Sequence, residues 1–242
     1  MRSRLVAAGC TAAGALGCLA LPSAAAHAAS LPKPSLDITA KSSYAYGTEV
    51  HFTVTLQAKE AGATVKFYAT PSGGKAKLVT AAKVNAKGKV YPSYRLTTST
   101  RFTAVFAGDA KDAPKKESRD VAATAKVISS ITGYYKTTKI SGNTYRVYHS
   151  DSTLTLHSTV APNAQGQCLE PETQQWDKGV GWDADDKYGC DKLTSTSHDT
   201  APFSLGKAAG DKYRIRARFV HGKNDAAIHS AVGGWIYLEV VK

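Results

Sequence analysis

The sequence predicts an all-β protein made of β-sandwiches, and three observations carry the prediction. Apolar and polar residues alternate from Glu49 to Gln57, which is the period of a half-buried strand. Similar short runs recur, separated by turn signals at Gly73-Gly74, Asn85–Gly88 and Gly108-Asp109. The 43% hydrophobic and 21% charged fractions are those of a folded globular chain. Short strands at this spacing are typical of a sandwich.

Further runs in the first half predict its other strands. These are Leu36–Ala40, Thr64–Tyr68, Lys89–Tyr91, Arg101–Phe106 and a closing strand at Val121–Val127. At the last corner, Asp109 and Asp112 lie three residues apart. Calcium would need more oxygen donors than this pair offers, so the favoured interpretation is a turn in which an Asp side chain binds its own backbone.

Four segments of the first half carry a resemblance to a known family. They are Tyr46–Val50, Thr64–Tyr68, Leu96–Thr100 and Phe106–Asp109. Together they resemble the bacterial immunoglobulin-like repeat, the Big-type domain of secreted and surface proteins, over residues 36–127. The resemblance implies a spacer, adhesion or accessory module and brings no catalytic residue with it.

The second half shows its own alternation. Ser141-Gly142-Asn143 indicates a hairpin turn, and Leu154, Leu156, Ser158 and Val160 share one face of the strand that follows. Tyr213, Ile215, Ala217 and Phe219 alternate with Arg214, Arg216 and Arg218. We therefore expect two tandem immunoglobulin-like sandwiches, residues 36–127 and a looser one over 128–242.

The first residues predict an export signal rather than part of the fold. Arg2 and Arg4 precede the apolar stretch Leu5–Leu21, and Ala26-His27-Ala28 supplies the small residues of a cleavage site. We expect a signal peptide over 1–28, cleavage after Ala28 and a short leader over 29–35. Lipid attachment at Cys18 is the alternative. The mature protein is expected to be secreted and extracellular, without a membrane span.

Two cysteines remain after cleavage, Cys168 and Cys190. In an oxidising compartment they should form a disulfide, whereas zinc would need further ligands and no His lies between them. Closing a loop of about 22 residues contributes about 3 kcal/mol in the chain-entropy model. We expect the bond to clamp a long loop, and Trp176 is placed to pack against it.

Charge is distributed unevenly. Residues 29–127 carry 16 Lys and Arg against 7 Asp and Glu, a net charge of +9, whereas residues 128–242 carry 13 against 12. A basic first half favours anionic surfaces such as cell-wall polymers or phospholipid headgroups, or it is simply a solvated face that discourages aggregation. No recognition motif for nucleic acid accompanies it.

The segment 170–191 is acidic, with a net charge of −5. Three interpretations compete. Calcium could bind where Asp183, Asp185 and Asp186 crowd together, although the Gly and closing Glu of an EF-hand are missing. A sugar could bind on the flat faces of Trp176, Trp182 and Tyr188. The Arg214, Arg216 and Arg218 row could lie opposite the acidic residues on a neighbouring strand. No metal or cofactor site is predicted.

No catalytic signature occurs, and lone histidines such as His198 belong to no nucleophile or metal motif. The sequence therefore predicts a secreted, non-catalytic binding, adhesion or spacer module. Its expected partner is a cell-wall polysaccharide, another anionic surface polymer or a protein. The alternative is a secreted hydrolase or inhibitor with its site on the 168–190 loop.

Overall fold

The structure is a computed structural model that describes residues 31–58, 62–187, 189–204, 208–222 and 227–242, with the side chains of 184–187 excepted. All regular secondary structure in these ranges is β-strand. Within them, no helix is long and apolar enough to cross a membrane. The predicted signal peptide, its cleavage position after Ala28, Cys18 and Tyr188 lie outside the described residues.

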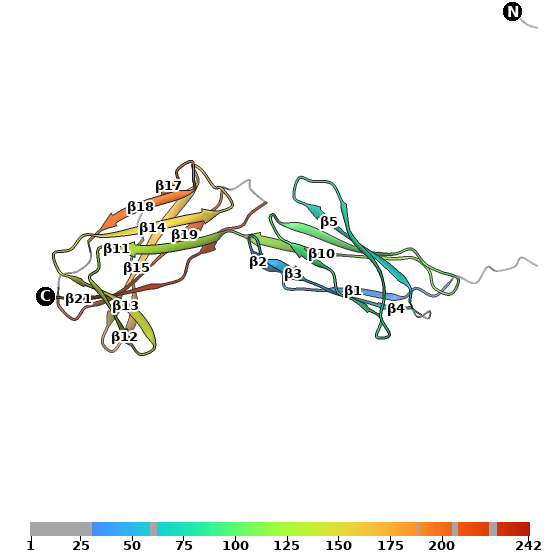
Figure 1. Cartoon of the computed structure of the whole chain (residues 1–242), viewed down its shortest axis with the longest axis horizontal. Helices are drawn as coiled ribbons and strands as arrows, with labels where there is room; N and C mark the ends of the chain where they lie inside the picture. The colour runs from blue at the N-terminus through green and yellow to red at the C-terminus, as the bar shows by residue number, and fades with distance from the viewer. Residues whose placement is uncertain (1–30, 59–61, 188, 205–207, 223–226) are drawn as a thin grey trace, which may run out of the picture. The chain divides into compact units, whose positions relative to one another are not determined.

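The described strands between Ser35 and Thr124 form three sheets (Figure 1). One has the order β1 (Ser35–Thr39), β4 (Thr53–Gln57) and β7 (Lys89–Val90). The largest has the order β2 (Ser43–Ala45), β10 (Lys115–Thr124), β9 (Thr100–Phe106), β5 (Thr64–Pro71) and β6 (Lys77–Lys83). The smallest pairs β3 (Glu49–His51) with β8 (Ser93–Arg95).

The described strands from Lys126 onward form two more sheets. The smaller has the order β11 (Lys126–Thr132), β14 (Leu154–Ala161) and β18 (His198–Phe203). The larger has the order β12 (Lys136–Ile140), β13 (Asn143–His149), β21 (Ile236–Val241), β19 (Lys212–Val220), β15 (Cys168–Asp177) and β16 (Gly181–Lys187). Two short strands join it, β17 (Asp191–Lys192) on β15 and β20 (Ala231–Val232) on β19. The all-β sandwich prediction is confirmed.

The long strand expected from Glu49 to Gln57 is divided at Phe52 into β3 and β4. Val50 pairs with Tyr94, and Val54 pairs with Val90. Between these pairs, the Phe52 amide donates to the Pro92 carbonyl at 2.9 Å. Proline has no N–H to return this bond, so the ladder is interrupted there.

Three phenylalanines form the centre of the first core. The Phe52 ring lies 5.1 Å from Phe67 and 4.4 Å from Phe102, measured between centroids, and all three side chains are buried. Phe67 belongs to β5 and Phe102 to β9 of the five-stranded sheet, whereas Phe52 lies between β3 and β4. Side chains from different sheets therefore meet face to face, as in a sandwich.

The second core follows the alternation that the sequence shows. Leu154, Leu156, Ser158 and Val160 of β14 are all buried, as expected. They belong to one buried cluster with Tyr213, Ile215, Ala217 and Phe219 of β19, Ser158 excepted. Ser158 binds the hydroxyl of Ser129 at 2.9 Å, so its polar group is satisfied.

Several predicted turns are confirmed. Ser141 and Gly142 have φ of 49° and 84° and join β12 to β13, which is the left-handed conformation that a tight hairpin requires. Asp109 Oδ1 accepts the backbone N–H groups of Lys111 and Asp112, each at 2.8 Å. The turn interpretation of Asp109 therefore holds.

Two sequence expectations need correction. The closing strand begins earlier than expected and ends at Thr124, and Val127 belongs to the next strand, β11. The segment 168–190 is not a long loop, because most of it forms the hairpin of β15 and β16. Leu169, Pro171 and Thr173 alternate as buried residues, and this period of two places β15 inside the sheet.

The Phe102→Ala change tests the first core. Its ring is fully buried and contacts Phe52, Phe67 and Tyr94. We expect the variant to lose about 3–5 kcal/mol of unfolding free energy, measured by urea unfolding. Tyr91→Ala is the matched control, since its side chain is 65% exposed. A loss for Phe102→Ala as small as that of the control would contradict this account of the core.

Candidate functional site

The register of β15 against β19 sets the outer face of the eight-stranded sheet in the second half of the chain. Glu170 lies opposite Arg218, and Glu172 lies opposite Arg216. The arginine row predicted to neighbour the acidic segment therefore does so. Because strand side chains alternate, the buried residues between these positions face the core and the charged ones share the outer face.

Two of the arginines are held by carboxylates. Arg216 binds Glu172 with two hydrogen bonds, from Nε at 2.9 Å and from Nη2 at 3.0 Å. Arg218 donates to Glu170 from Nε at 3.1 Å and also from Nη2. The Arg216 pair engages both carboxylate oxygens, whereas both Arg218 nitrogens share the Glu170 Oε2 atom, and the side chains of both pairs are partly buried. Where these two pairs lie, the outer face is therefore nearly neutral, because each arginine is matched by a carboxylate.

Toward the turn of the β15–β16 hairpin, the same face is aromatic. Trp176 and Trp182 pack edge to face at 5.3 Å between ring centroids, and Trp182 lies 5.8 Å from Tyr237. The Arg214 guanidinium lies 4.7 Å from the Trp182 ring centroid and 4.4 Å from that of Trp235. We call this group, Trp176, Trp182, Arg214, Trp235 and Tyr237, the aromatic face.

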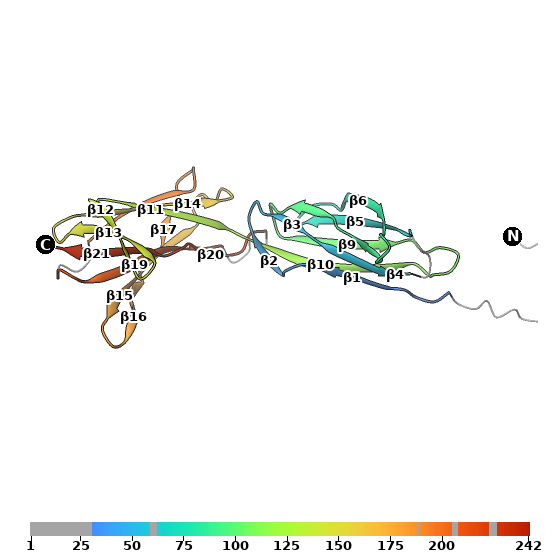
Figure 2. The same ribbon diagram turned by 60° about the horizontal axis from the view of Figure 1, so that its bottom comes forward.

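The aromatic face lies at the β15–β16 hairpin, which projects beyond the other strands of its sheet (Figure 2). The Trp176 ring packs against Trp182, yet the Trp176 residue remains 45% exposed. Val180 at the hairpin turn is 77% exposed. An indole left open to water beside an ordered aromatic partner is a surface suited to a ligand.

Tyr145 borders the aromatic face from β13. Its ring packs 5.3 Å from Tyr237. Burial raises the pKa of the Tyr145 hydroxyl, Tyr237 and Glu239 act in the same direction, and the Arg214 charge opposes them. The Arg214 guanidinium is thus electrostatically coupled to this end of the face.

The structure brings together two of the three aromatic residues named from the sequence, Trp176 and Trp182, while Tyr188 lies outside the described residues. Cys168 and Cys190 form a disulfide with 5.1 Å between their Cα atoms. Trp176 does not pack on it. Eight residues of extended strand at about 3.4 Å each separate them.

Sequence reasoning missed Trp235 and the role of Arg214. The Arg214 guanidinium contacts Trp182 of one strand and Trp235 beside another. The only local signal was the alternation of arginines with buried residues in β19. That signal shows which way the arginines point, but not which rings they meet.

The calcium interpretation stays a prediction, because two of its three carboxylates lie outside the described side chains. No group of three or more His, Cys, Asp or Glu side chains that could hold a metal occurs among them. The side chains of Asp185 and Asp186 lie outside the described set, and Asp183 is exposed.

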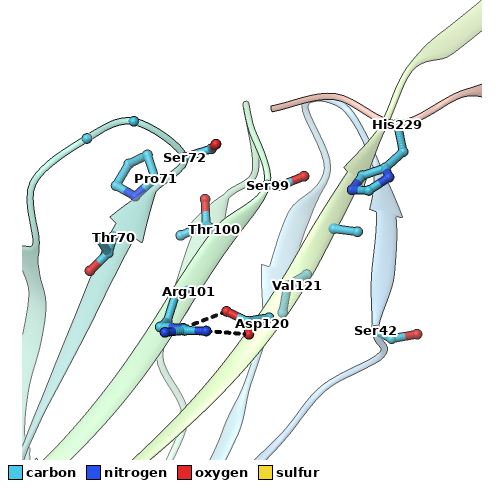
Figure 3. Close-up of a pocket in the computed structure, with 13 residues that line it drawn as sticks. Ser42, Thr70, Pro71, Ser72, Ser99, Thr100, Arg101, Asp120, Val121 and His229 are labelled. Atoms are coloured by element: carbon cyan, nitrogen blue, oxygen red, sulfur yellow. Dashed lines mark hydrogen bonds and ion pairs between the residues drawn. The ribbon is translucent and has the colours of Figure 1, made fainter. Parts of the chain in front are cut away.

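A hollow of about 490 Å³ opens beside β9 and β10, away from the aromatic face (Figure 3). Arg101 donates to both oxygens of Asp120 at 2.8 and 2.9 Å, and this bonding lowers the pKa of Asp120. The other polar lining is mostly hydroxyl, and part of it is already used. Ser99 Oγ accepts the Ala123 amide at 3.1 Å, and Thr100 Oγ1 donates to the Thr98 carbonyl at 2.7 Å. His229 lies at its rim, with its amide bound to the Ala123 carbonyl at 2.8 Å.

The histidines near β18 form no arrangement in which one group activates another. The His157 and His198 rings lie 6.0 Å apart, and each ring bonds a threonine hydroxyl, Thr132 and Thr200 respectively. Asp199 Oδ2 is buried without a hydrogen-bond partner. The carboxylate therefore does not orient either ring through this oxygen.

The Asp199 pKa is raised. Burial is the largest cause and Asp191 adds to it, while the Thr200 amide and His198 act in the opposite direction. A carboxyl with a raised pKa in the folded state costs free energy once it is ionised.

No protein-family model and no curated protein matches the sequence. Solved structures with a similar architecture include a marsupial T cell receptor, at 12% identity, over 85% of this chain and 72% of that chain, with a TM-score of 0.34. A tetra-tandem repeat from the extending region of a large adhesion protein matches at 12% identity, over 84% of this chain and 49% of that one, with a TM-score of 0.34. The BSP domain of a biofilm associated protein matches at 13% identity, over 86% and 29%, with a TM-score of 0.26. The chain thus spans less than two thirds of the adhesion and biofilm chains, and each match is a likeness of fold alone.

The Asp199→Asn change tests the buried carboxyl. The contribution of Asp199 to stability is fully present below its unfolded pKa, near 3.8, and is lost as pH rises through the higher folded value. We therefore expect the variant to have a higher Tm than the wild type at pH 7. The difference should vanish below about pH 3.8. Thermal unfolding from acid to neutral pH, with Asp151→Asn in an exposed turn as control, measures this. An unchanged or lower Tm at pH 7 would show that Asp199 is not penalised by burial.

Proposed function

We propose that the protein is a secreted, non-catalytic module that binds a polysaccharide at the cell exterior through the aromatic face. The observation that carries the proposal is the exposed Trp176 indole, ordered by Trp182. The C–H bonds of a sugar ring lie flat against an indole, and a ring already fixed in place loses little entropy on binding. Buried tryptophans would support the fold, but a half-exposed one supports contact with a ligand.

The setting of the module is part of the same proposal. Residues 1–28 act as a signal peptide that is cleaved after Ala28, residues 36–127 form a bacterial immunoglobulin-like repeat, and residues 128–242 form a second sandwich. The Cys168–Cys190 disulfide supports secretion, because such bonds persist in oxidising compartments. The match in strand and turn pattern over 36–127 supports assignment to the repeat family.

The hairpin offers little to the alternative of a hydrolase. Glu170 and Glu172 are each held by an arginine, and the segment 168–190 contains neither Ser nor His. Its threonine, Thr173, is 1% exposed. We therefore favour binding over catalysis at this surface.

A second binding mode is favoured by the lysines of the first sandwich. Lys66 lies opposite Val105, which in turn lies opposite Lys116 on the other side of β9. Lys83 follows on the same outer face, opposite Thr64, and all three lysine side chains are exposed. This basic face would attract an anionic wall polymer without selecting its sugars.

Removal of the exposed indole tests the aromatic face. We expect Trp176→Ala to weaken binding of the purified mature protein to insoluble cell-wall polysaccharide by about tenfold or more. The control is Tyr91→Ala, an equally simple loss of an exposed ring. Sedimentation with increasing amounts of wall measures the affinity. Equal binding by Trp176→Ala and wild type would overturn the proposed site.

Salt separates the two binding modes. Raising NaCl from about 0.05 to about 0.5 M shortens the screening length to a few ångströms, so attraction by the basic face should largely disappear. Binding through Trp176 should persist. The variant with Lys66, Lys83 and Lys116 each changed to Gln should bind at low salt as the wild type does at high salt. Low-salt binding that is unchanged by these substitutions would exclude the basic face.

A further inference from the structure

The charge ladder on the outer face has one unmatched position. Along β15 the outward residues are Glu170, Glu172 and Gln174, and along β19 they lie opposite Arg218, Arg216 and Arg214. The first two arginines face a carboxylate. Arg214 faces the neutral amide of Gln174, and its Nε donates to Gln174 Oε1 at 2.6 Å. The third pair therefore binds through a hydrogen bond without cancelling the arginine's charge.

Within the described part of the chain, Arg214 has no carboxylate partner. Two indoles contact its guanidinium, whose carbon lies 4.7 Å from the Trp182 centroid and 4.4 Å from that of Trp235, a ring that Arg216 shares at 4.1 Å. Its Nε is occupied by Gln174. The terminal nitrogens Nη1 and Nη2 are what remains for another partner. Contact with two indoles and the hydrogen bond to Gln174 orient the group in advance, so an anion would bind it with little loss of side-chain entropy.

Two acidic residues near the turn of the hairpin, Asp177 and Asp183, lie on the face opposite to that of Arg214. Trp176 pairs with Trp182 on the same face as Gln174. Asp177 and Asp183 each follow one of these tryptophans in sequence, so strand alternation places them on the opposite face. The aromatic face thus combines an open indole with an oriented cation, which are the two groups that an acidic sugar would use.

We infer that the aromatic face binds a carboxylated sugar unit, with Arg214 holding the carboxylate and Trp176 contacting the ring. The inference rests on the proposed function and names its ligand class. The neighbouring Arg216 and Arg218 of the same strand bind carboxylates, and they are the model for this contact, which Arg214 would make with Nη1 and Nη2. Two parallel hydrogen bonds from a guanidinium to a planar carboxylate add geometric specificity to the attraction of charge. Arg214 is then the specificity-determining residue of the face.

The test compares three probes that differ in their acid group. Calorimetric titration would use oligogalacturonate, the same oligomer with its carboxyls methyl-esterified, and poly(glycerol phosphate). We expect the wild type to prefer the acidic oligomer over the ester by about tenfold or more, since hydrogen bonds to charged groups are worth that much. A stronger response to poly(glycerol phosphate) would overturn the carboxylate assignment.

The most informative variant is Gln174→Glu, because it places a carboxylate of the protein itself opposite Arg214. We expect it to remove the preference for the acidic oligomer while it keeps the weaker binding of the ester. Arg214→Gln should do the same, and Arg214→Lys should keep only part of the preference, since it retains the charge without the fork. Arg146→Gln is the control, on β13 of the same sheet, and should bind like the wild type.

The outcomes distinguish this inference from the proposed function. If acidic and esterified oligomers bind equally and both depend on Trp176, the inference fails and the proposed function stands. If Gln174→Glu retains the preference for the acidic oligomer, Arg214 does not bind the carboxylate and the inference fails. If neither oligomer binds and Trp176→Ala binds cell wall like the wild type, both fail together.

Discussion

Between β15 and β19, a single hydrogen-bonded register determines both the core and the surface of the second sandwich. Leu169 pairs with Phe219 and Pro171 with Ala217, so these four side chains enter the core. The residues between them face outward by necessity. A slip of one residue would turn the arginines inward, where unpaired charge costs several kcal/mol. The arrangement of the candidate site is therefore fixed by the same constraint that buries the core.

The hairpin that carries Trp176 is held at two places along its length. The Cys168–Cys190 disulfide joins the beginning of β15 to the chain beyond β16, and the Trp176–Trp182 pair closes the ladder near the turn. Covalent and aromatic contacts therefore restrain opposite ends of one projecting ribbon. A binding surface placed on it is preorganised, although it lies far from the phenylalanine core of the first sandwich in sequence and belongs to a different sheet.

The two sandwiches present different chemistry on their outer faces. The five-stranded sheet of the first presents separate lysines such as Lys66 and Lys116, whose charge acts at long range and is screened by salt. The largest sheet of the second presents arginines bound to carboxylates or stacked on indoles, whose contacts are short and directional. The first kind of surface attracts a polymer, and the second can discriminate among its units. The proposed attachment and the proposed selectivity thus belong to separate faces.

The sequence by itself determined the strand alternation, most turns, the disulfide and the neighbourhood of arginines and acidic residues, because each depends on local period or on pairing of rare residue types. Tertiary structure decided the rest. The hairpin within 168–190 was hidden by its polar composition, and the break at Phe52 required knowledge that Pro92 lies opposite. Arg214 meets Trp182 and Trp235 only through strand order in the sheet. Alternation fixes the face on which a side chain lies, whereas its partners across the sheet depend on non-local pairing that no short segment encodes.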